Sequence, residues 1–180
     1  MKTSSSKTQE KAPESTENLT RDAAVKKIRE LAESARTCLF GTISNPPLLS
    51  VRPMAVQTVD DAGSIWFLSG RSSDKNEHIL DDPRVQLFFA NTGASEYLTL
   101  DGTAVIHEDR ATREKHWSPI AKTWFPGGVD DPELTVIEVQ VTDGHYWDTK
   151  HGKMVSVMKI AVGAITGKHM DDGVEGNVRP

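Results

Sequence analysis

Short apolar segments joined by tight turns dominate the first half of this sequence, and they restrict the fold more than any other feature. Residues 37–44 and 48–59 have the composition of β-strands and flank an Asn-Pro-Pro turn at residues 45–47. A second turn, at residues 60–63, leads into the apolar segment 64–69. Strands with such short connections pair antiparallel, because a parallel pair needs a long crossover. We therefore expect an antiparallel meander.

The remaining apolar segments predict further strands and several helices around them. Strands are expected at residues 85–91, 97–106, 134–141 and 144–148. Helices are expected at residues 21–36, 74–80, 109–117 and 153–165. About seven short strands with few long apolar runs favour a small barrel over a sandwich. The sequence thus predicts a mainly β protein of the β+α type: an antiparallel split β-barrel of six to seven strands with peripheral helices.

Polar residues are concentrated at the two ends of the 180-residue chain. Residues 1–19 are rich in Ser and Thr, and residues 167–180 in Gly and charged side chains. Such segments bury too little apolar surface to offset the entropy cost of ordering. We expect a disordered tail over residues 1–19, one domain over residues 20–166 and a flexible tail over residues 167–180.

The composition excludes several classes of protein. Lys and Arg total 21 against 26 Asp and Glu, and the net charge of −5 lacks the basic footprint of a nucleic-acid binder. No apolar run approaches the length of a membrane span, and residues 1–17 lack the apolar core of a secretory signal. The single Cys38 cannot form an intrachain disulfide, and the histidine spacing matches no standard metal site. We expect a cytoplasmic protein that binds neither nucleic acid, membrane nor metal.

Residues 66–75 pass from the end of a strand to the start of a helix through three serines. Backbone N–H groups at a helix start suit a phosphate, and Arg71 or Lys75 would neutralise its charge. An ordinary capped helix with solvated charges would have the same sequence. Arg52, on the neighbouring strand, could reach the same anion or pair with a surface carboxylate. The convergence of two strands on one cationic corner favours the anion.

Two further features are consistent with a flat ligand near this corner. Pro53 removes a backbone N–H from the strand beside Arg52, where a ring system could lie. Trp117 and Trp124 lie in a segment rich in Pro and Gly. Aromatic side chains in such a segment cover a core, form an interface or wall a ligand site, and the sequence leaves these alternatives open.

Five short motifs, taken in their order along the chain, resemble those of the general-stress-protein branch of the pyridoxamine 5′-phosphate oxidase-like superfamily. They are Arg-Pro-Met at 52–54, Trp-Phe-Leu-Ser at 66–69, Ser-x-x-Lys at 72–75, Trp-Phe-Pro-Gly-Gly at 124–128 and Tyr-Trp-Asp at 146–148. The likeness covers about residues 20–165. It implies a homodimeric split β-barrel that holds FMN at the dimer interface, with FAD and a deazaflavin as alternatives.

The resemblance also assigns site residues. It implies that the FMN phosphate lies near Arg52, Ser72 and Lys75. The isoalloxazine ring would lie against Pro53, Met54, Ala55, Phe67, Leu68 and Ser69. Trp124 and Phe125 would close the pocket, from the same or the partner chain. No side chain stands out as a catalytic acid or base, as expected if the cofactor carries the chemistry.

The expected function is that of an FMN-binding general stress protein, acting as a flavin-dependent oxidoreductase on an unknown small molecule. A flavin-binding protein without turnover, such as a sensor, and pyridoxamine 5′-phosphate oxidase itself are the alternatives. The last is disfavoured by two departures. The chain has Asp74-Lys75 where those oxidases carry Arg-Lys, and it ends in Gly-Asn-Val-Arg-Pro in place of their Arg-Leu-x-Pro segment.

Overall fold

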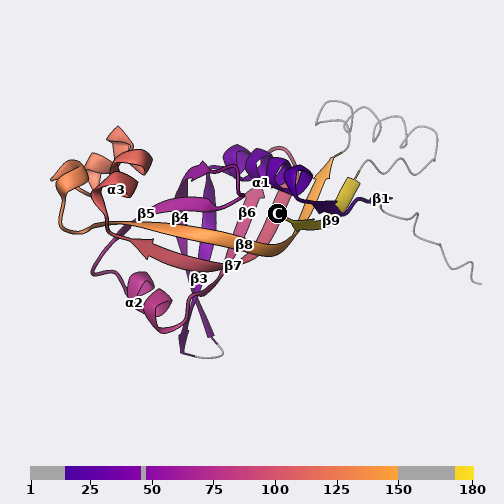
Figure 1. The fold of residues 1–180 in the computed structure, drawn as a ribbon. Helices are drawn as coiled ribbons and strands as arrows, with labels where there is room; N and C mark the ends of the chain where they lie inside the picture. The colour runs from indigo at the N-terminus through magenta and orange to yellow at the C-terminus, as the bar shows by residue number, and fades with distance from the viewer. Residues whose placement is uncertain (1–14, 46–47, 150–172) are drawn as a thin grey trace, which may run out of the picture.

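A computed structural model describes residues 15–45, 48–149 and 173–180, in which nine strands form one strongly curved sheet (Figure 1). The strands are β1 (Ser15–Thr16), β2 (Leu19–Thr20), β3 (Thr37–Asn45), β4 (Leu48–Val59), β5 (Ile65–Gly70), β6 (Arg84–Asn91), β7 (Glu96–His107), β8 (Leu134–Thr149) and β9 (Gly173–Arg179). The helices are α1 (Asp22–Ala35), α2 (Asp74–Asp81) and α3 (Arg110–His116), followed by the short 3-10 helices η1 (Pro119–Thr123) and η2 (Gly128–Asp130).

Six of these strands close into an antiparallel ring. Their order is β8-β5-β4-β3-β6-β7, and β7 returns to β8. The ring opens between β4 and β5, which pair only from Val56 opposite Phe67 to Val59 opposite Ile65. The prediction of an antiparallel split β-barrel with peripheral helices is therefore confirmed.

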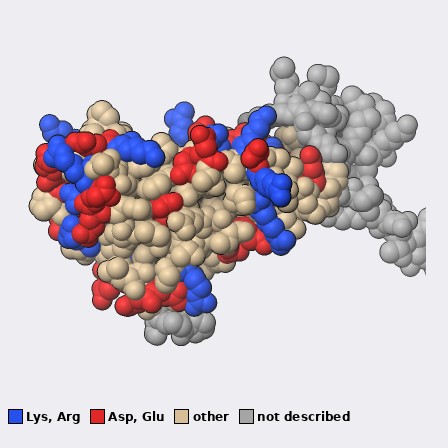
Figure 2. All heavy atoms as spheres, in the orientation of Figure 1, with Lys and Arg blue, Asp and Glu red and all other residues tan. Residues whose placement is uncertain are grey.

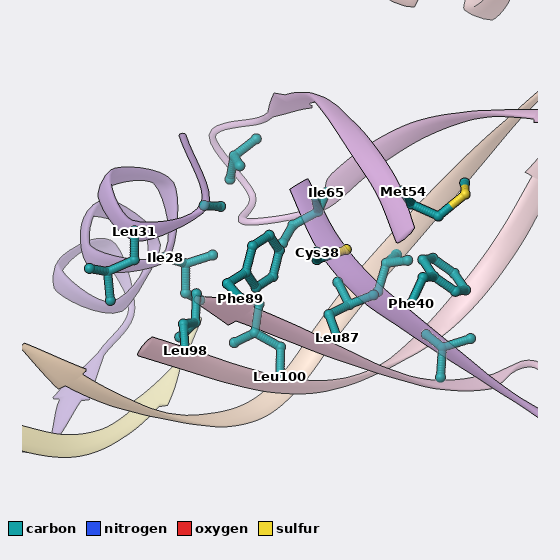
Figure 3. Close-up of a cluster of buried hydrophobic side chains, with 14 of the residues drawn as sticks. Ile28, Leu31, Cys38, Phe40, Met54, Ile65, Leu87, Phe89, Leu98 and Leu100 are labelled. Carbon is teal, nitrogen blue, oxygen red and sulfur yellow. The ribbon is translucent and has the colours of Figure 1, made fainter. Parts of the chain in front are cut away.

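The barrel is filled by alternate side chains of its strands. Phe40 and Phe67 are fully buried and meet edge to face, with ring centroids 5.2 Å apart. Figure 3 shows Phe40 at one end of the cluster and Ile28 and Leu31 of α1 at the other. The apolar stripe of α1 thus closes one opening of the barrel. Each such side chain stabilises the fold by about 1.5–3 kcal/mol through burial.

Cys38 lies in this core, as expected of a cysteine that acts as a small apolar side chain. Burial raises the pKa of its thiol to about 12. The thiolate, which is the nucleophilic form, is therefore scarcely populated at neutral pH.

The C-terminal strands differ from the prediction in one respect. Residues 134–141 and 144–148 belong to one continuous strand, β8, which extends through Gly144. A Cβ atom at Gly144 would approach Leu100 Cδ2 and Thr99 O to 2.5 Å. The glycine therefore allows β7 and β8 to pack closely and does not end the strand.

The prediction of flexible tails is wrong for the parts that the structure describes. Residues 173–179 form β9, which pairs antiparallel with β8, and β1 and β2 pair parallel with β9. Val174 and Val178 alternate along β9 and are buried, and the Tyr146 hydroxyl donates to the Glu17 carbonyl at 2.9 Å. Because every second side chain of a strand points to the same face, these two valines are buried together and stabilise β9, although most of its other residues are polar. Residues 1–14 and the helix predicted at residues 153–165 lie outside the described residues.

Charged side chains of both signs are interspersed on the face shown in Figure 2. Around α3 they form ion pairs, in which Arg110 contacts Glu114 and Asp130. Within the described ranges, no helix is both long enough and apolar enough to cross a membrane.

Candidate functional site

A cavity of about 600 Å³ lies where β4 and β5 separate. Its walls come from β4, the end of β5, the start of α2 and the segment that contains η1. The lining residues are Pro53, Met54, Ala55, Gln57, Leu68, Ser69, Gly70, Ser73, Lys75, Ser118, Ile120, Ala121, Trp124, Phe125 and Glu133. Most of these side chains are apolar, and the charged ones are Lys75 and Glu133.

The separation of the two strands creates this space. The β4–β5 pairing begins at Val56 and Phe67, so Pro53 to Ala55 lie beyond it. Pro53 pairs in register with Leu39 of β3 on the other side of β4. Since proline has no N–H to donate, it suits a position where the ladder to β5 is not needed. The sequence signal at Pro53 therefore marks one wall of the cavity.

Arg52 is held beside the cavity by neutral oxygen atoms. Its guanidinium donates to Thr42 Oγ1 at 2.7 Å, to Ser50 Oγ at 2.6 Å and to the Phe40 carbonyl at 3.4 Å. Thr42 is fully buried, and its hydroxyl also lies 3.0 Å from Nδ1 of His78 in α2. Burial lowers the pKa of Arg52, so the charge is partly desolvated and is not neutralised by these contacts.

Lys75 adds a second cation to the same corner. Its pKa is lowered, first by burial and then by the charge of Arg52, whereas Asp74 acts in the opposite direction. Among the described residues, none forms a hydrogen bond or ion pair with the Lys75 ammonium group. Two half-buried positive charges therefore repel each other, and an anion bound between them would relieve both.

The serines of this corner are already engaged. Ser72 donates its backbone N–H and its hydroxyl to one carboxylate oxygen of Glu133, at 3.1 and 2.6 Å. These hydrogen bonds lower the pKa of Glu133. The Ser73 hydroxyl donates to the Gly70 carbonyl at 2.6 Å. Arg71 pairs with Glu108 at 2.6 Å and is not directed to the corner that Arg52 and Lys75 share.

A buried polar network fixes the start of α2 against the sheet. The Ser69 hydroxyl donates to Asn76 Oδ1 at 2.6 Å, and Asn76 Nδ2 donates to Thr135 Oγ1 at 3.0 Å. Thr135 in turn donates to the Ser69 carbonyl at 2.9 Å. Each buried group thus has a partner, which positions Lys75 one residue before Asn76.

The segment after α3 forms the opposite wall of the cavity. Phe125 and Ala121 pack with Leu134 in a small apolar cluster against the sheet. Trp124 is 69% exposed and Ile120 is 72% exposed, although both line the cavity. The wall therefore presents large apolar surfaces to the cavity and to the solvent.

The structure brings most of the predicted site residues together. Eight of them line the cavity: Pro53, Met54, Ala55, Leu68, Ser69, Lys75, Trp124 and Phe125. Arg52 lies beside them, as its electrostatic effect on Lys75 shows. Ser72 contacts the cavity residue Glu133, whereas the Phe67 side chain is buried in the barrel core.

Sequence reasoning missed Glu133, Ile120, Thr42 and the Asn76–Thr135 pair. Glu133 lies 61 residues from Ser72 and Thr42 lies 36 residues from His78, and no local pattern joins such partners. Ile120 had a signal, since an apolar residue follows Pro119 beside Trp117 in the segment already identified.

The chain matches known proteins over most of its length. A family model described as "Pyridoxamine 5′-phosphate oxidase like" matches residues 23–171. The protein bli-3 of Neurospora crassa is 30% identical over 126 residues, which cover 65% of this chain and 60% of that protein. The chain thus spans about three fifths of the length of this curated relative.

Solved structures with a similar fold include two general stress proteins. A candidate general stress protein 26 from Jannaschia sp. CCS1 has a TM-score of 0.71 and 25% identity, over 87% of this chain and 95% of that one. A structure described as the general stress FMN/FAD binding protein of Xanthomonas citri has a TM-score of 0.60 and 24% identity, over 69% and 87% of the two chains.

Proposed function

The chain belongs to the pyridoxamine 5′-phosphate oxidase-like family, and we propose that its cavity binds the flavin FMN. The observation that carries this proposal is the pair of half-buried cations, Arg52 and Lys75, at one end of an apolar cavity. A phosphate would relieve their repulsion, and the apolar walls suit a flat ring system.

In this proposal Arg52, Ser72 and Lys75 bind the phosphate. The isoalloxazine ring contacts Pro53, Met54 and Ala55 on one side of the cavity, and Trp124 on the η1 side helps to exclude water. FMN supplies electron transfer, and the residues of the chain bind and orient it. The Xanthomonas citri protein, described as binding FMN or FAD, supports a flavin in general. The single cationic corner favours FMN, which carries one phosphate.

We also propose a homodimer with the cofactor at its interface. Leu39, Leu49 and Val51 are 50%, 42% and 47% exposed on the outer face of β3 and β4. Pro53 and Ala55 are exposed on β4 and also line the cavity, so the apolar face continues into the site. Exposed apolar patches mark interfaces. A second copy packed on this face would complete the cavity wall.

The activity proposed is that of a cytoplasmic flavin-dependent oxidoreductase acting on a small molecule. The titratable side chains among the described lining residues are Lys75 and Glu133, and neither is needed as an acid or base if the flavin carries the chemistry. The single Cys38 is consistent with the reducing cytoplasm.

The visible absorption spectrum of the purified protein tests flavin binding, followed by titration with FMN, FAD, riboflavin and a deazaflavin. A protein that stays colourless after incubation with each flavin would contradict the proposal.

Light scattering of Val51→Lys beside wild type tests the dimer, and the variant is expected to be monomeric. Steady-state turnover with NADPH and an electron acceptor tests catalysis. Flavin reduction no faster than that of free FMN would instead indicate a flavin carrier or sensor.

A further inference from the structure

Glu133 occupies an anion-binding position at the start of α2. One of its carboxylate oxygens accepts the Ser72 backbone N–H at 3.1 Å and the Ser72 hydroxyl at 2.6 Å. A backbone N–H and a serine hydroxyl near a helix start are the donors with which proteins commonly bind phosphate. The Glu133 carboxylate thus lies where a ligand anion would accept the same two bonds.

The backbone of Glu133 is fixed, whereas its side chain is exposed. The Glu133 N–H donates to Asp131 Oδ1 at 3.0 Å, and the Glu133 carbonyl accepts from the Arg71 N–H at 2.7 Å. These bonds keep the residue next to α2. The exposed side chain, however, can turn into solvent, where water solvates the carboxylate, so that displacement costs only its hydrogen bonds to Ser72. The contact with Ser72 is therefore replaceable by another anion.

Glu133 also brings negative charge to the cavity that it shares with Lys75. The hydrogen bonds from Ser72 lower its pKa, so it is ionised at neutral pH. A phosphate that approached Ser72 would have to displace this carboxylate or lie beside a like charge, and both cost free energy. A ligand without phosphate would meet neither cost.

We propose that Glu133 is a specificity-determining residue, which competes with the phosphate of a bound flavin for Ser72. This inference rests on the proposed flavin function. The Glu133 carboxylate accepts the two Ser72 hydrogen bonds until a phosphate replaces it as the acceptor. Glu133 therefore weakens binding of phosphorylated flavins relative to riboflavin.

Calorimetric titration of the full chain with FMN and riboflavin tests the proposal. Glu133→Ala is expected to tighten FMN binding by about two- to tenfold, the range of one net hydrogen bond. Glu133→Gln, which keeps an acceptor but loses the charge, is expected to tighten it less. Riboflavin binding should not change. Glu108→Gln, which removes another exposed carboxylate that contacts Arg71, is the matched control and should leave both affinities unchanged.

Three results would overturn the inference: unchanged FMN affinity in Glu133→Ala, weaker FMN binding, or equal tightening of FMN and riboflavin. Weaker binding of both flavins would instead identify Glu133 as a direct ligand contact.

Melting temperature in inorganic phosphate is a second readout, which needs no flavin. The phosphate-induced rise should be larger in Glu133→Ala than in wild type. If neither wild type nor any variant binds a flavin, the proposed function fails. An equal rise in melting temperature with phosphate in wild type and Glu133→Ala would separately refute competition at Ser72.

Discussion

Trp66 of β5 and His116 of α3 stack face to face, with ring centroids 4.2 Å apart and planes inclined by 11°. His116 is 4% exposed, and its Nδ1 lies 3.0 Å from Thr58 Oγ1. Its Nε2 is buried without a hydrogen-bond partner among the described residues. The Trp66 indole N–H is fixed by Asp60 at 2.9 Å. This stack attaches the segment that forms one cavity wall to the barrel.

The stack predicts a loss of stability in mild acid. Burial lowers the pKa of His116, and the charge of Lys115 lowers it further. Below pH about 6.5 the unfolded chain therefore binds a proton that the folded chain resists, and the free energy of unfolding falls as pH decreases toward the folded pKa. His116→Phe keeps an aromatic ring but cannot titrate. Urea unfolding between pH 7.5 and 5.5 should show a shallower decrease for this variant, and equal slopes would contradict the prediction.

Lys75→Met should separate stability from binding. Removing the ammonium group relieves its desolvation and its repulsion with Arg52, so the free energy of unfolding without ligand should rise by up to about 1 kcal/mol. FMN binding should weaken by roughly 1.5–3 kcal/mol, the range for hydrogen bonds to charged groups. Thermal melting and fluorescence titration measure the two effects. Lys122→Met, on the exposed side of η1, is the control, and equal effects of both substitutions would count against a phosphate site at Lys75.

Thr42→Val tests whether the hydroxyl between Arg52 and His78 positions the guanidinium. The substitution removes the contact of His78 Nδ1 and one of the three hydrogen bonds of Arg52, and it should destabilise the fold by about 1–3 kcal/mol. FMN affinity should also fall, because Arg52 loses its 2.7 Å contact. Thr42→Ser, which keeps the hydroxyl, should restore FMN affinity even if some stability is lost. A serine variant that binds FMN as weakly as the valine variant would exclude a positioning role.

Gly176→Ala should detach the N-terminal strands from β9. A Cβ at this position would collide with the Glu17 carbonyl oxygen, which accepts the Tyr146 hydroxyl. We expect a loss of about 1–3 kcal/mol in unfolding free energy, as for other overpacked positions. Gly70→Ala is the matched control, since a Cβ there meets no atom within 4 Å. Equal melting temperatures of the two variants would show that the β1–β9 pairing contributes little.

The hairpin pairings of β3 with β4 and of β4 with β5 could be predicted because they rest on local signals, whereas the pairings of β3 with β6 and of β5 with β8 join strands far apart in the sequence. The turn at residues 60–63 and the apolar segment after it can be recognised from their own residues, without reference to distant parts of the chain. By contrast, β9 is stabilised by burial of Val174 and Val178 against a sheet more than twenty residues earlier in the chain, and its own composition is polar. The cationic corner was predictable for a similar reason, since Arg52 and the start of α2 lie on either side of one hairpin. The Glu133–Ser72 contact depends on the register of β8 against β5, which no local pattern determines.

The central position of β8 has a consequence for the order in which parts of the molecule open. This strand pairs with β5, β7 and β9 and runs along most of the sheet, whereas the helices after α3 lie at one end of it (Figure 1). Local opening of residues 117–130 therefore requires far less free energy than exposure of the β8 amides. Hydrogen exchange should be fast in this segment and limited by global unfolding in β8. Under the proposed function, exchange of the flavin is then expected to require opening of this segment alone, while the barrel stays folded.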